Sequence, residues 1–197
     1  MEIVLATRNP SKAQQIMHMF EGSSINVLTL DDVGVVGDAI EDGNTLEENA
    51  MKKVIFTREQ LGGTYWIMAD DTGLFINALD GKPGIKAARW AGENATTDEI
   101  TQHTLDQLQG ATDRSATFRT VVAMMSPEGQ EYYFDGEVKG VLLPERMAPA
   151  QPKMPYSPLF MPDGMNKVWA QMSVEEENAV SHRGKAFGAT REFLESL

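Results

Sequence analysis

The chain has 197 residues, which at about 150 residues per domain favours one domain spanning residues 1–197. Hydrophobic residues make up 42% of it, and no apolar run reaches the roughly 20 residues of a membrane span, so a membrane-spanning protein is not expected. The 17 basic and 29 acidic residues give a net charge of −12, which disfavours binding along a nucleic acid but allows a small anionic ligand in a locally cationic pocket. Cysteine is absent, which excludes disulfides and thiolate metal sites and, with no basic signal-peptide region at the N-terminus, favours a cytoplasmic location.

The N-terminal segment predicts a strand, a polar loop and a helix in succession. Residues 2–6 form a short apolar run typical of a buried strand. Asn9 suits the N-cap of the following helix, and Pro10 suits its first turn. Lys12 lies where backbone N–H groups of a helix N-terminus can meet a phosphate, although a surface lysine is an equal alternative. Residues 25–30 predict a second strand.

Two pairs of residues with capping-box spacing predict helices in the middle of the chain. Thr45 and Glu48 predict a helix to about residue 60, and Thr96 and Glu99 predict another to about residue 108. Between them, the apolar run 65–69 predicts a buried strand.

The C-terminal half begins with two long strands, predicted at 116–125 and 131–141. Prolines then recur between residues 144 and 162 and predict a long irregular loop, of the kind that is often functional. A short helix is predicted after Ser173, and residues 181–185 lead into a final helix.

The adjacent carboxylates of Asp70 and Asp71 are the most informative local feature. Neighbouring side chains of a strand point to opposite faces, so only a turn beginning at residues 72–73 would aim both carboxylates at one cavity. Both would there suit Mg²⁺, which takes hard oxygen ligands. A solvated turn is the alternative, just as a solvated surface cluster is the alternative for His182 and Arg183.

Several segments together resemble the motifs of one known family. The segments are Thr7-x-Asn9-x-x-Lys12, Glu41-x-Gly43-x-Thr45-x-x-Glu48-Asn49-Ala50-x-x-Lys53, Asp70-Asp71-Thr72-Gly73-Leu74 with Gly81-x-Pro83-Gly84 and Ala88-Arg89-Trp90-Ala91-Gly92, Arg114-x-Ala116-x-Phe118, and Ser181-His182-Arg183-Gly184-Lys185-Ala186. In order and spacing they resemble the inosine triphosphate pyrophosphatase family, whose members hydrolyse non-standard purine nucleoside triphosphates to the monophosphate and pyrophosphate. The resemblance implies an α/β fold with an elongated central mixed sheet and flanking helices. It further implies two lobes around a substrate cleft and assembly as a homodimer.

The resemblance also implies roles for particular residues. Those expected at the triphosphate are Thr7, Asn9, Lys12, Lys53, Thr72 and Gly73. Glu41 and Asp71, with Asp70 in support, are expected to hold Mg²⁺ and to orient water for attack on the α-phosphorus. His182 and Arg183 are expected beside the base, where Arg183 would donate to a 6-keto oxygen. Lys12, Lys53 and Asp71 are the expected catalytic residues, in a mechanism of positioning and charge neutralisation.

The chain departs from the family pattern at the base. The family's Gly-Phe-Gly-Tyr-Asp-Pro stretch is Lys153-Met154-Pro155-Tyr156-Ser157-Pro158 here, so Met154 replaces the stacking aromatic residue and Ser157 the aspartate. Glu177 stands in place of a lysine. We therefore expect Met154, Tyr156, Ser157 and Glu177 at the base, and a base preference shifted or relaxed toward amino-bearing purines unless neighbouring residues compensate.

Two other functions are compatible with the sequence. One is a nucleotide-binding or regulatory homologue with little turnover, which the altered proline-rich loop suggests but the intact phosphate end opposes. The other is a pyrophosphatase for modified pyrimidine nucleotides, which the match at His182 and Arg183 disfavours.

Overall fold

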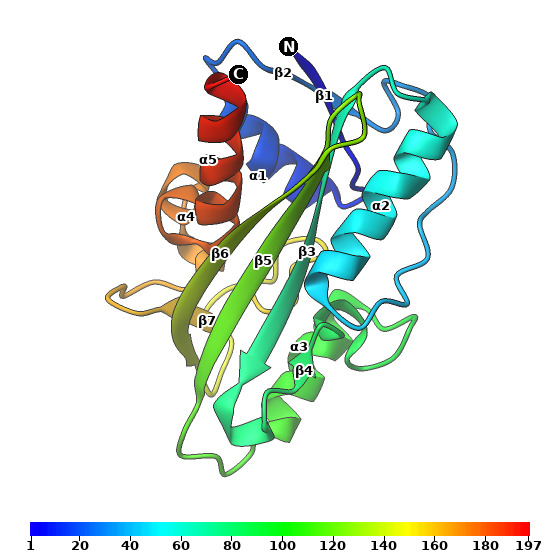
Figure 1. Cartoon of the computed structure of the whole chain (residues 1–197). Coiled ribbons are helices and arrows are strands. Elements are labelled where there is room, and N and C mark those ends of the chain that lie inside the picture. Colours follow the sequence, from blue (N-terminus) through cyan, green and yellow to red (C-terminus); the bar gives the residue numbers. More distant parts are fainter.

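A computed structural model describes all 197 residues as one mixed sheet with helices on both faces (Figure 1). The strands are β1 (Glu2–Leu5), β2 (Asn26–Thr29), β3 (Trp66–Ile76), β4 (Pro83–Gly84), β5 (Ser115–Met125), β6 (Glu131–Leu142) and β7 (Phe160–Pro162). The α-helices are α1 (Pro10–Phe20), α2 (Leu46–Leu61), α3 (Thr97–Gln107), α4 (Val174–Val180) and α5 (His182–Glu195). Three 3-10 turns are η1 (Asn77–Leu79), η2 (Ala87–Arg89) and η3 (Trp169–Gln171). None of the helices is both long and apolar enough to cross a membrane.

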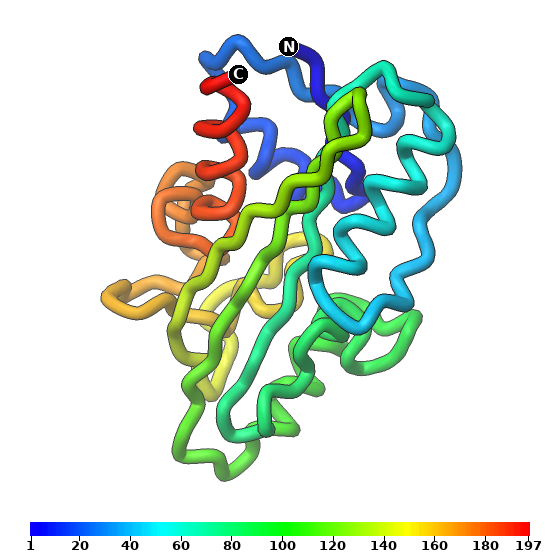
Figure 2. Tube along the Cα trace, in the orientation of Figure 1, coloured from blue at the N-terminus to red at the C-terminus, as the bar shows by residue number.

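The seven strands follow the order β2-β1-β3-β5-β6-β7, with β4 paired to β3. β1 pairs in parallel with β2 and β3, and the remaining pairs are antiparallel. The long strands β3, β5 and β6 make the sheet elongated, and the tube in Figure 2 has both termini at the same end of its long axis. The predicted elongated mixed sheet with flanking helices is therefore confirmed.

Apolar side chains alternate between the two faces of the sheet along its central strands, which explains why helices cover both faces. Met68 and Met124 pack with the apolar residues of α1 and α5, whereas Ile67 and Ala123, one position away, pack with those of α2. A third core cluster lies beyond these two and joins the far ends of β3 and β5 to α3 and the loop before β7. Residues 67–68 of β3 thus contact α2 on one face of the sheet and α1 and α5 on the other.

The helix N-termini follow the sequence signals closely. Thr96 and Ser173 each complete a capping box with the residue three positions later. The Thr45 hydroxyl accepts from the Glu48 amide, but the Glu48 carboxylate accepts from the Asn44 amide at 2.6 Å, so this box is not closed. The helix nevertheless begins as predicted, because one capped amide is enough to mark its start.

The predicted turn after Asp71 is wrong. β3 continues without a break from Trp66 to Ile76, because β5 pairs with it along residues 67–76. Asp70 and Asp71 are therefore neighbours in a strand, and their side chains point to opposite faces of the sheet. The expectation that residues 181–185 precede the last helix also needs correction, since His182 opens α5 with Ser181 as its N-cap.

Candidate functional site

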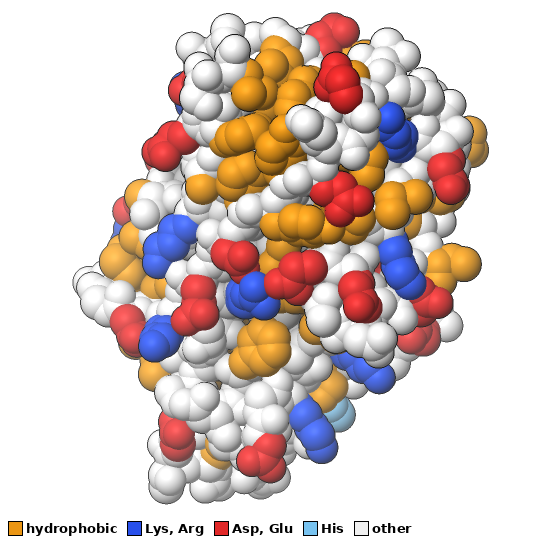
Figure 3. All heavy atoms as spheres, in the orientation of Figure 1, with side chains coloured by type: hydrophobic (Ala, Val, Ile, Leu, Met, Phe, Trp, Pro, Cys, Tyr) orange, Lys and Arg blue, Asp and Glu red, His pale blue; other side chains and the backbone are white.

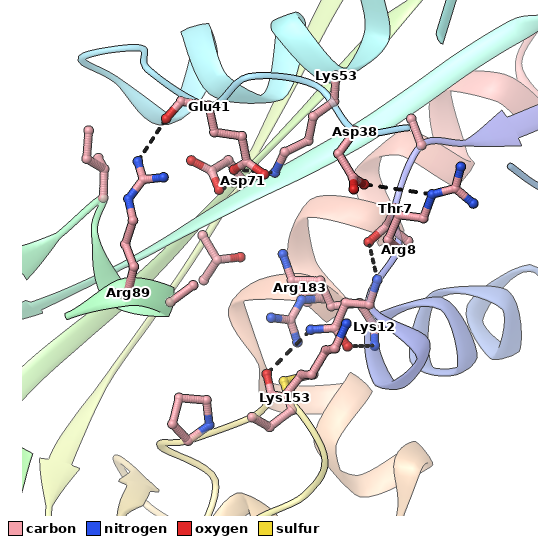
Figure 4. Close-up of a pocket in the computed structure, with 18 of the residues that line it drawn as sticks. Thr7, Arg8, Lys12, Asp38, Glu41, Lys53, Asp71, Arg89, Lys153 and Arg183 are labelled. Carbon is pink, nitrogen blue, oxygen red and sulfur yellow. Dashed lines mark hydrogen bonds and ion pairs between the residues drawn. The ribbon is translucent and has the colours of Figure 1, made fainter. Parts of the chain in front are cut away.

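A cavity of about 400 Å³ lies where the β1–α1 loop, the segment before α2, β3, the loop 151–157 and α5 converge (Figure 4). It gathers most of the residues expected from the sequence: Thr7, Asn9, Lys12, Glu41, Lys53, Asp71, Thr72, Met154, Tyr156, Ser157, Glu177, His182 and Arg183. Asp70 and Gly73 do not line it. At Gly73 an added Cβ would lie 2.8 Å from Cε2 of Phe75, so packing inside the sheet accounts for this glycine.

On the α2 side, two carboxylates meet one ammonium group. Lys53 Nζ lies 2.9 Å from Glu41 Oε2 and 3.5 Å from Asp71 Oδ1, and it donates to the Asp70 carbonyl oxygen at 3.0 Å. Asn49 Nδ2 donates to Asp71 Oδ2 at 3.1 Å. Burial raises the pKa of Asp71 despite Lys53. Burial also acts to lower the pKa of Lys53, but the carboxylates of Asp71 and Glu41 outweigh it and leave that pKa raised.

On the opposite face of the sheet, Asp70 is the counter-ion of two cations. Lys12 Nζ donates to Asp70 Oδ2 at 2.8 Å, and Arg183 Nε lies 3.7 Å from the same oxygen. Burial acts to raise the pKa of Asp70, but Lys12 and Arg183 outweigh it and hold the pKa well below its usual range. Asp70 Oδ1 accepts no hydrogen bond. The two adjacent aspartates therefore serve separate groups of charges.

The free backbone N–H groups at the start of α1 are already bound by the side chain of its N-cap residue, Asn9. Asn9 Oδ1 accepts from the amides of Ser11 and Lys12 at 3.1 and 3.3 Å, and the Asn9 amide donates to Thr7 Oγ1 at 3.2 Å. The expectation that the Lys12 segment offers free backbone donors to a phosphate is therefore not met. Positive charge reaches this part of the cavity through side chains instead.

The other end of the cavity is aromatic. The imidazole of His182 stacks on Phe118, with centroids 4.9 Å apart and planes 21° apart, and lies 4.9 Å from the ring of Trp169. Burial, followed by the nearby Arg183, lowers the pKa of His182 well below its ordinary value, so the ring is neutral at pH 7. Neither nitrogen of this ring, nor Trp169 Nε1, has a hydrogen-bond partner. The alternative of a solvated surface cluster is wrong, since His182 and Arg183 are both buried.

Gln15 links two residues of this end and was missed by the sequence reasoning. Gln15 Nε2 donates to Glu177 Oε1 at 3.0 Å, and Gln15 Oε1 accepts from Arg183 Nη1 at 2.7 Å. Burial raises the pKa of Glu177. The helical spacing from Lys12 to Gln15 was the available signal, because it places both side chains on one side of α1.

The two hydroxyl groups expected at the base are engaged within the protein. Tyr156 Oη donates to the Ala87 carbonyl oxygen at 2.7 Å. Ser157 Oγ donates to the Met154 carbonyl oxygen at 2.8 Å and accepts from the Gln151 amide at 3.0 Å. These residues therefore shape the loop that borders the cavity.

Two arginines to which the sequence assigned no role, Arg89 within a family motif and Arg8 beside one, hold the segment carrying Glu41. Arg89 Nη2 donates to the Glu41 carbonyl oxygen at 2.8 Å. Arg8 lies 3.8 Å from Asp38 Oδ1 (Figure 4). It also lies 2.6 Å from Asp31 Oδ1 and donates to the Val35 carbonyl oxygen. No spacing rule connects them to Glu41, since the contacts span an irregular segment.

The donor set fits a divalent cation only in part. The structure has no group of three or more acidic or histidine side chains placed to hold a metal. Glu41 and Asp71 do converge on one point, the ammonium of Lys53, beside the cavity. Two carboxylates suit Mg²⁺ when substrate phosphates and water complete its shell.

Comparisons with known proteins agree on one family over the whole chain. The profile of the Ham1 family matches residues 3–193. A dITP/XTP pyrophosphatase of Caldanaerobacter subterraneus subsp. tengcongensis is 37% identical over 196 residues, covering 98% of this chain and 96% of that protein. A HAM1 protein from Coxiella burnetii has a structure similar over 100% of both chains, with a TM-score of 0.86 and 32% identity. The Staphylococcus aureus Ham1 protein matches 100% of this chain and 99% of its own, with a TM-score of 0.83 and 33% identity. The family resemblance is thus confirmed, and the chain belongs to the Ham1 family.

Proposed function

We propose that this protein hydrolyses non-standard purine nucleoside triphosphates, among them dITP and XTP, to the nucleoside monophosphate and pyrophosphate. The observation that carries the proposal is a single cavity with an ionic end, at Lys12, Lys53 and Asp71, and a buried aromatic end, at His182 and Trp169. These ends suit the polyphosphate and the base of one nucleotide. The dITP/XTP pyrophosphatases at up to 39% identity support the same substrates.

In the reaction, the oxygen of a water molecule bonds to the α-phosphorus. The bond from that phosphorus to the α,β-bridging oxygen breaks, pyrophosphate leaves, and the proton of the water passes to solvent. Asp71 and Glu41 orient the water as hydrogen-bond acceptors, while Lys53 and Lys12 neutralise charge on the phosphates. Asn9 and Thr72 border the same end of the cavity and position the phosphates.

Glu41 and Asp71 are the residues that would hold Mg²⁺, whose role when bound is to neutralise charge on the substrate phosphates. Asp70 supports the site from the other face of β3, because it fixes Lys12 and Arg183 and does not line the cavity.

At the base end, a donor and an acceptor lie next to one another. Arg183 and Glu177 bind the same Gln15 carboxamide, and Glu177 Oε2 makes no hydrogen bond of its own. A 6-oxopurine presents an oxygen and an N1–H on one edge, which matches Arg183 as donor and Glu177 as acceptor. The 2-amino group of guanine offers Glu177 one more donor, so a preference extended toward amino-bearing 6-oxopurines is part of the proposal. Met154 borders this end as the apolar neighbour of the base.

We further propose that residues 1–197 act as one bilobed domain and as a homodimer in the cytoplasm. The three core clusters that meet at β3 and β5 support a single domain. Apolar side chains gather on the upper half of the face in Figure 3, which supports the dimer. Light scattering on the purified protein measures its molar mass and so tests whether it is a dimer.

The test is pyrophosphate release from dITP, XTP, dGTP, dATP and dTTP, with Mg²⁺ and with excess chelator. We expect metal-dependent release, ranked with the 6-oxopurines first, and a loss of at least about 100-fold in Asp71→Asn. Asp163→Asn, at an exposed position outside the cavity, is the matched control. Binding without release from any triphosphate would instead identify a regulatory homologue, and a preference for dTTP would identify a pyrimidine enzyme.

A further inference from the structure

Lys153 differs from every other basic residue that borders the cavity. The other five each have a carboxylate oxygen within 4.0 Å: Arg8, Lys12, Lys53, Arg89 and Arg183. Lys153 has no ion pair, its ammonium makes no hydrogen bond, and its side chain is exposed at the rim. Its charge is therefore available to a ligand, whereas the charge of each of the others is already partly neutralised.

The backbone of Lys153 is also unusual. Its φ is 57°, in the left-handed region that a residue with a Cβ enters at a cost in free energy. The only other non-glycine residue with positive φ is Asp80, a type that tolerates this conformation. A glycine at position 153 would avoid this cost, so the chain carries a lysine side chain where its backbone conformation disfavours one.

The surrounding contacts hold this conformation beside the start of α1. Asn9 Nδ2 donates to the Lys153 carbonyl oxygen at 3.4 Å, and Ser11 Oγ donates to the Pro152 carbonyl oxygen at 2.8 Å. Figure 4 places Lys153 on the same side of the cavity as Lys12 and Arg183, across from Glu41, Asp71 and Lys53. The loop is thereby attached to the residues proposed to bind phosphate.

We propose that Lys153 is an additional substrate-binding residue, whose ammonium binds the terminal phosphates of the triphosphate. This inference rests on the proposed function. Because the aromatic end of the cavity is buried and Lys153 is exposed at the rim, the polyphosphate rather than the base extends toward it. Lys153 then stabilises bound substrate and bound pyrophosphate alike, and it takes no part in breaking the α,β bond.

Three substitutions separate the charge from the backbone conformation. Lys153→Gln removes the charge, Lys153→Arg keeps it, and Lys153→Gly removes it and relieves the positive φ. Lys139→Gln, at an exposed lysine without an ion pair and outside this cavity, gives the same change in net charge. The measurements are KM and kcat with dITP, the inhibition constants of pyrophosphate and of dIMP, and the melting temperature.

We expect Lys153→Gln and Lys153→Gly to raise the KM and the pyrophosphate inhibition constant about fivefold, with kcat and dIMP inhibition unchanged. The difference from the unmodified protein should shrink as salt rises from about 0.05 M to about 0.5 M. Lys153→Arg should keep the original values, and Lys153→Gly should melt at a higher temperature while binding more weakly. A purely structural role predicts no such opposition between stability and binding.

Equal KM and equal pyrophosphate inhibition in Lys153→Gln and in Lys139→Gln would overturn the inference while leaving the proposed function intact. An effect on dIMP as large as that on pyrophosphate would also overturn it, because the charge would then not act at the terminal phosphates. If the unmodified protein hydrolyses no triphosphate, the proposed function fails. Calorimetric titration with pyrophosphate then still decides the Lys153 contact.

Discussion

His182 lies at the neutral, aromatic end of the cavity, and its titration makes the free energy of unfolding depend on pH. Its imidazole is buried between Phe118 and Trp169, and burial lowers its pKa well below the value of about 6.5 of an exposed histidine. As the pH falls below about 6.5, the unfolded chain takes up a proton at this position and the folded chain does not. This residue therefore lowers the free energy of unfolding on the acid side of pH 6.5, and not above it.

The substitution His182→Phe should remove that pH dependence, because a phenyl ring fills the same stack and does not titrate. We expect the free energy of unfolding of the unmodified protein to fall relative to His182→Phe by about 1.4 kcal/mol per pH unit below pH 6.5. Urea unfolding of both proteins at several pH values between 5 and 8 measures the difference. A constant difference across that range would show that the imidazole is already solvated or protonated in the folded protein.

At the scale of elements, substitutions of two glycines, one facing α5 and one within it, have opposite expected effects. A Cβ at Gly136 in β6 would lie 1.9 Å from the His182 carbonyl oxygen and 2.6 Å from the Ala186 amide nitrogen. Gly136→Ala must therefore push α5 away from the sheet, and with it the first turn that carries His182 and Arg183. We expect a loss of more than about 2 kcal/mol in stability and a lower kcat/KM for dITP.

Gly188→Ala, within α5 itself, is the matched control. A Cβ there would have no heavy atom within 4 Å, and alanine is favoured over glycine inside a helix. It should raise stability by about 0.5 to 1 kcal/mol and leave kcat/KM unchanged. Thermal melting and steady-state kinetics of both variants decide the point, and a stable, fully active Gly136→Ala protein would contradict the packing described at this contact.

The same elements show what the sequence could predict and what it could not. Helix starts at Thr96 and Ser173 were predictable, since capping depends on residues three positions apart. The continuity of β3 through Asp70 and Asp71 was not, because it is imposed by β5, some 50 residues later. The family motifs indicated which residues lie at the cavity. No local pattern could show that Asp70 pairs with Lys12 and Asp71 with Lys53, because these ion pairs depend on the same long-range strand pairing.

For the whole molecule, the strong negative charge and the anionic substrate are compatible. The net charge is −12, but the cavity is lined by six basic and five acidic side chains. This lining is close to neutral, which is less positive than the locally cationic pocket expected from the sequence. Tight binding of a triphosphate therefore needs further positive charge, which supports the proposal that Glu41 and Asp71 would hold a divalent cation.

Because the cavity is lined by α1, α2, α5, β3 and the loop before β7, its ligand is expected to stabilise the fold as a whole. A dITP analogue with a methylene group between the α- and β-phosphorus binds without being cleaved. With Mg²⁺ and at 100 times its dissociation constant, it should add about 2.7 kcal/mol to the free energy of unfolding and raise the melting temperature by about 5 to 10 °C. Pyrophosphate or deoxyinosine alone, at the same concentration, should each give a smaller shift, since each fills one end of the cavity. A shift with pyrophosphate as large as that with the analogue would mean that the aromatic end contributes nothing to binding, and that the base is read elsewhere.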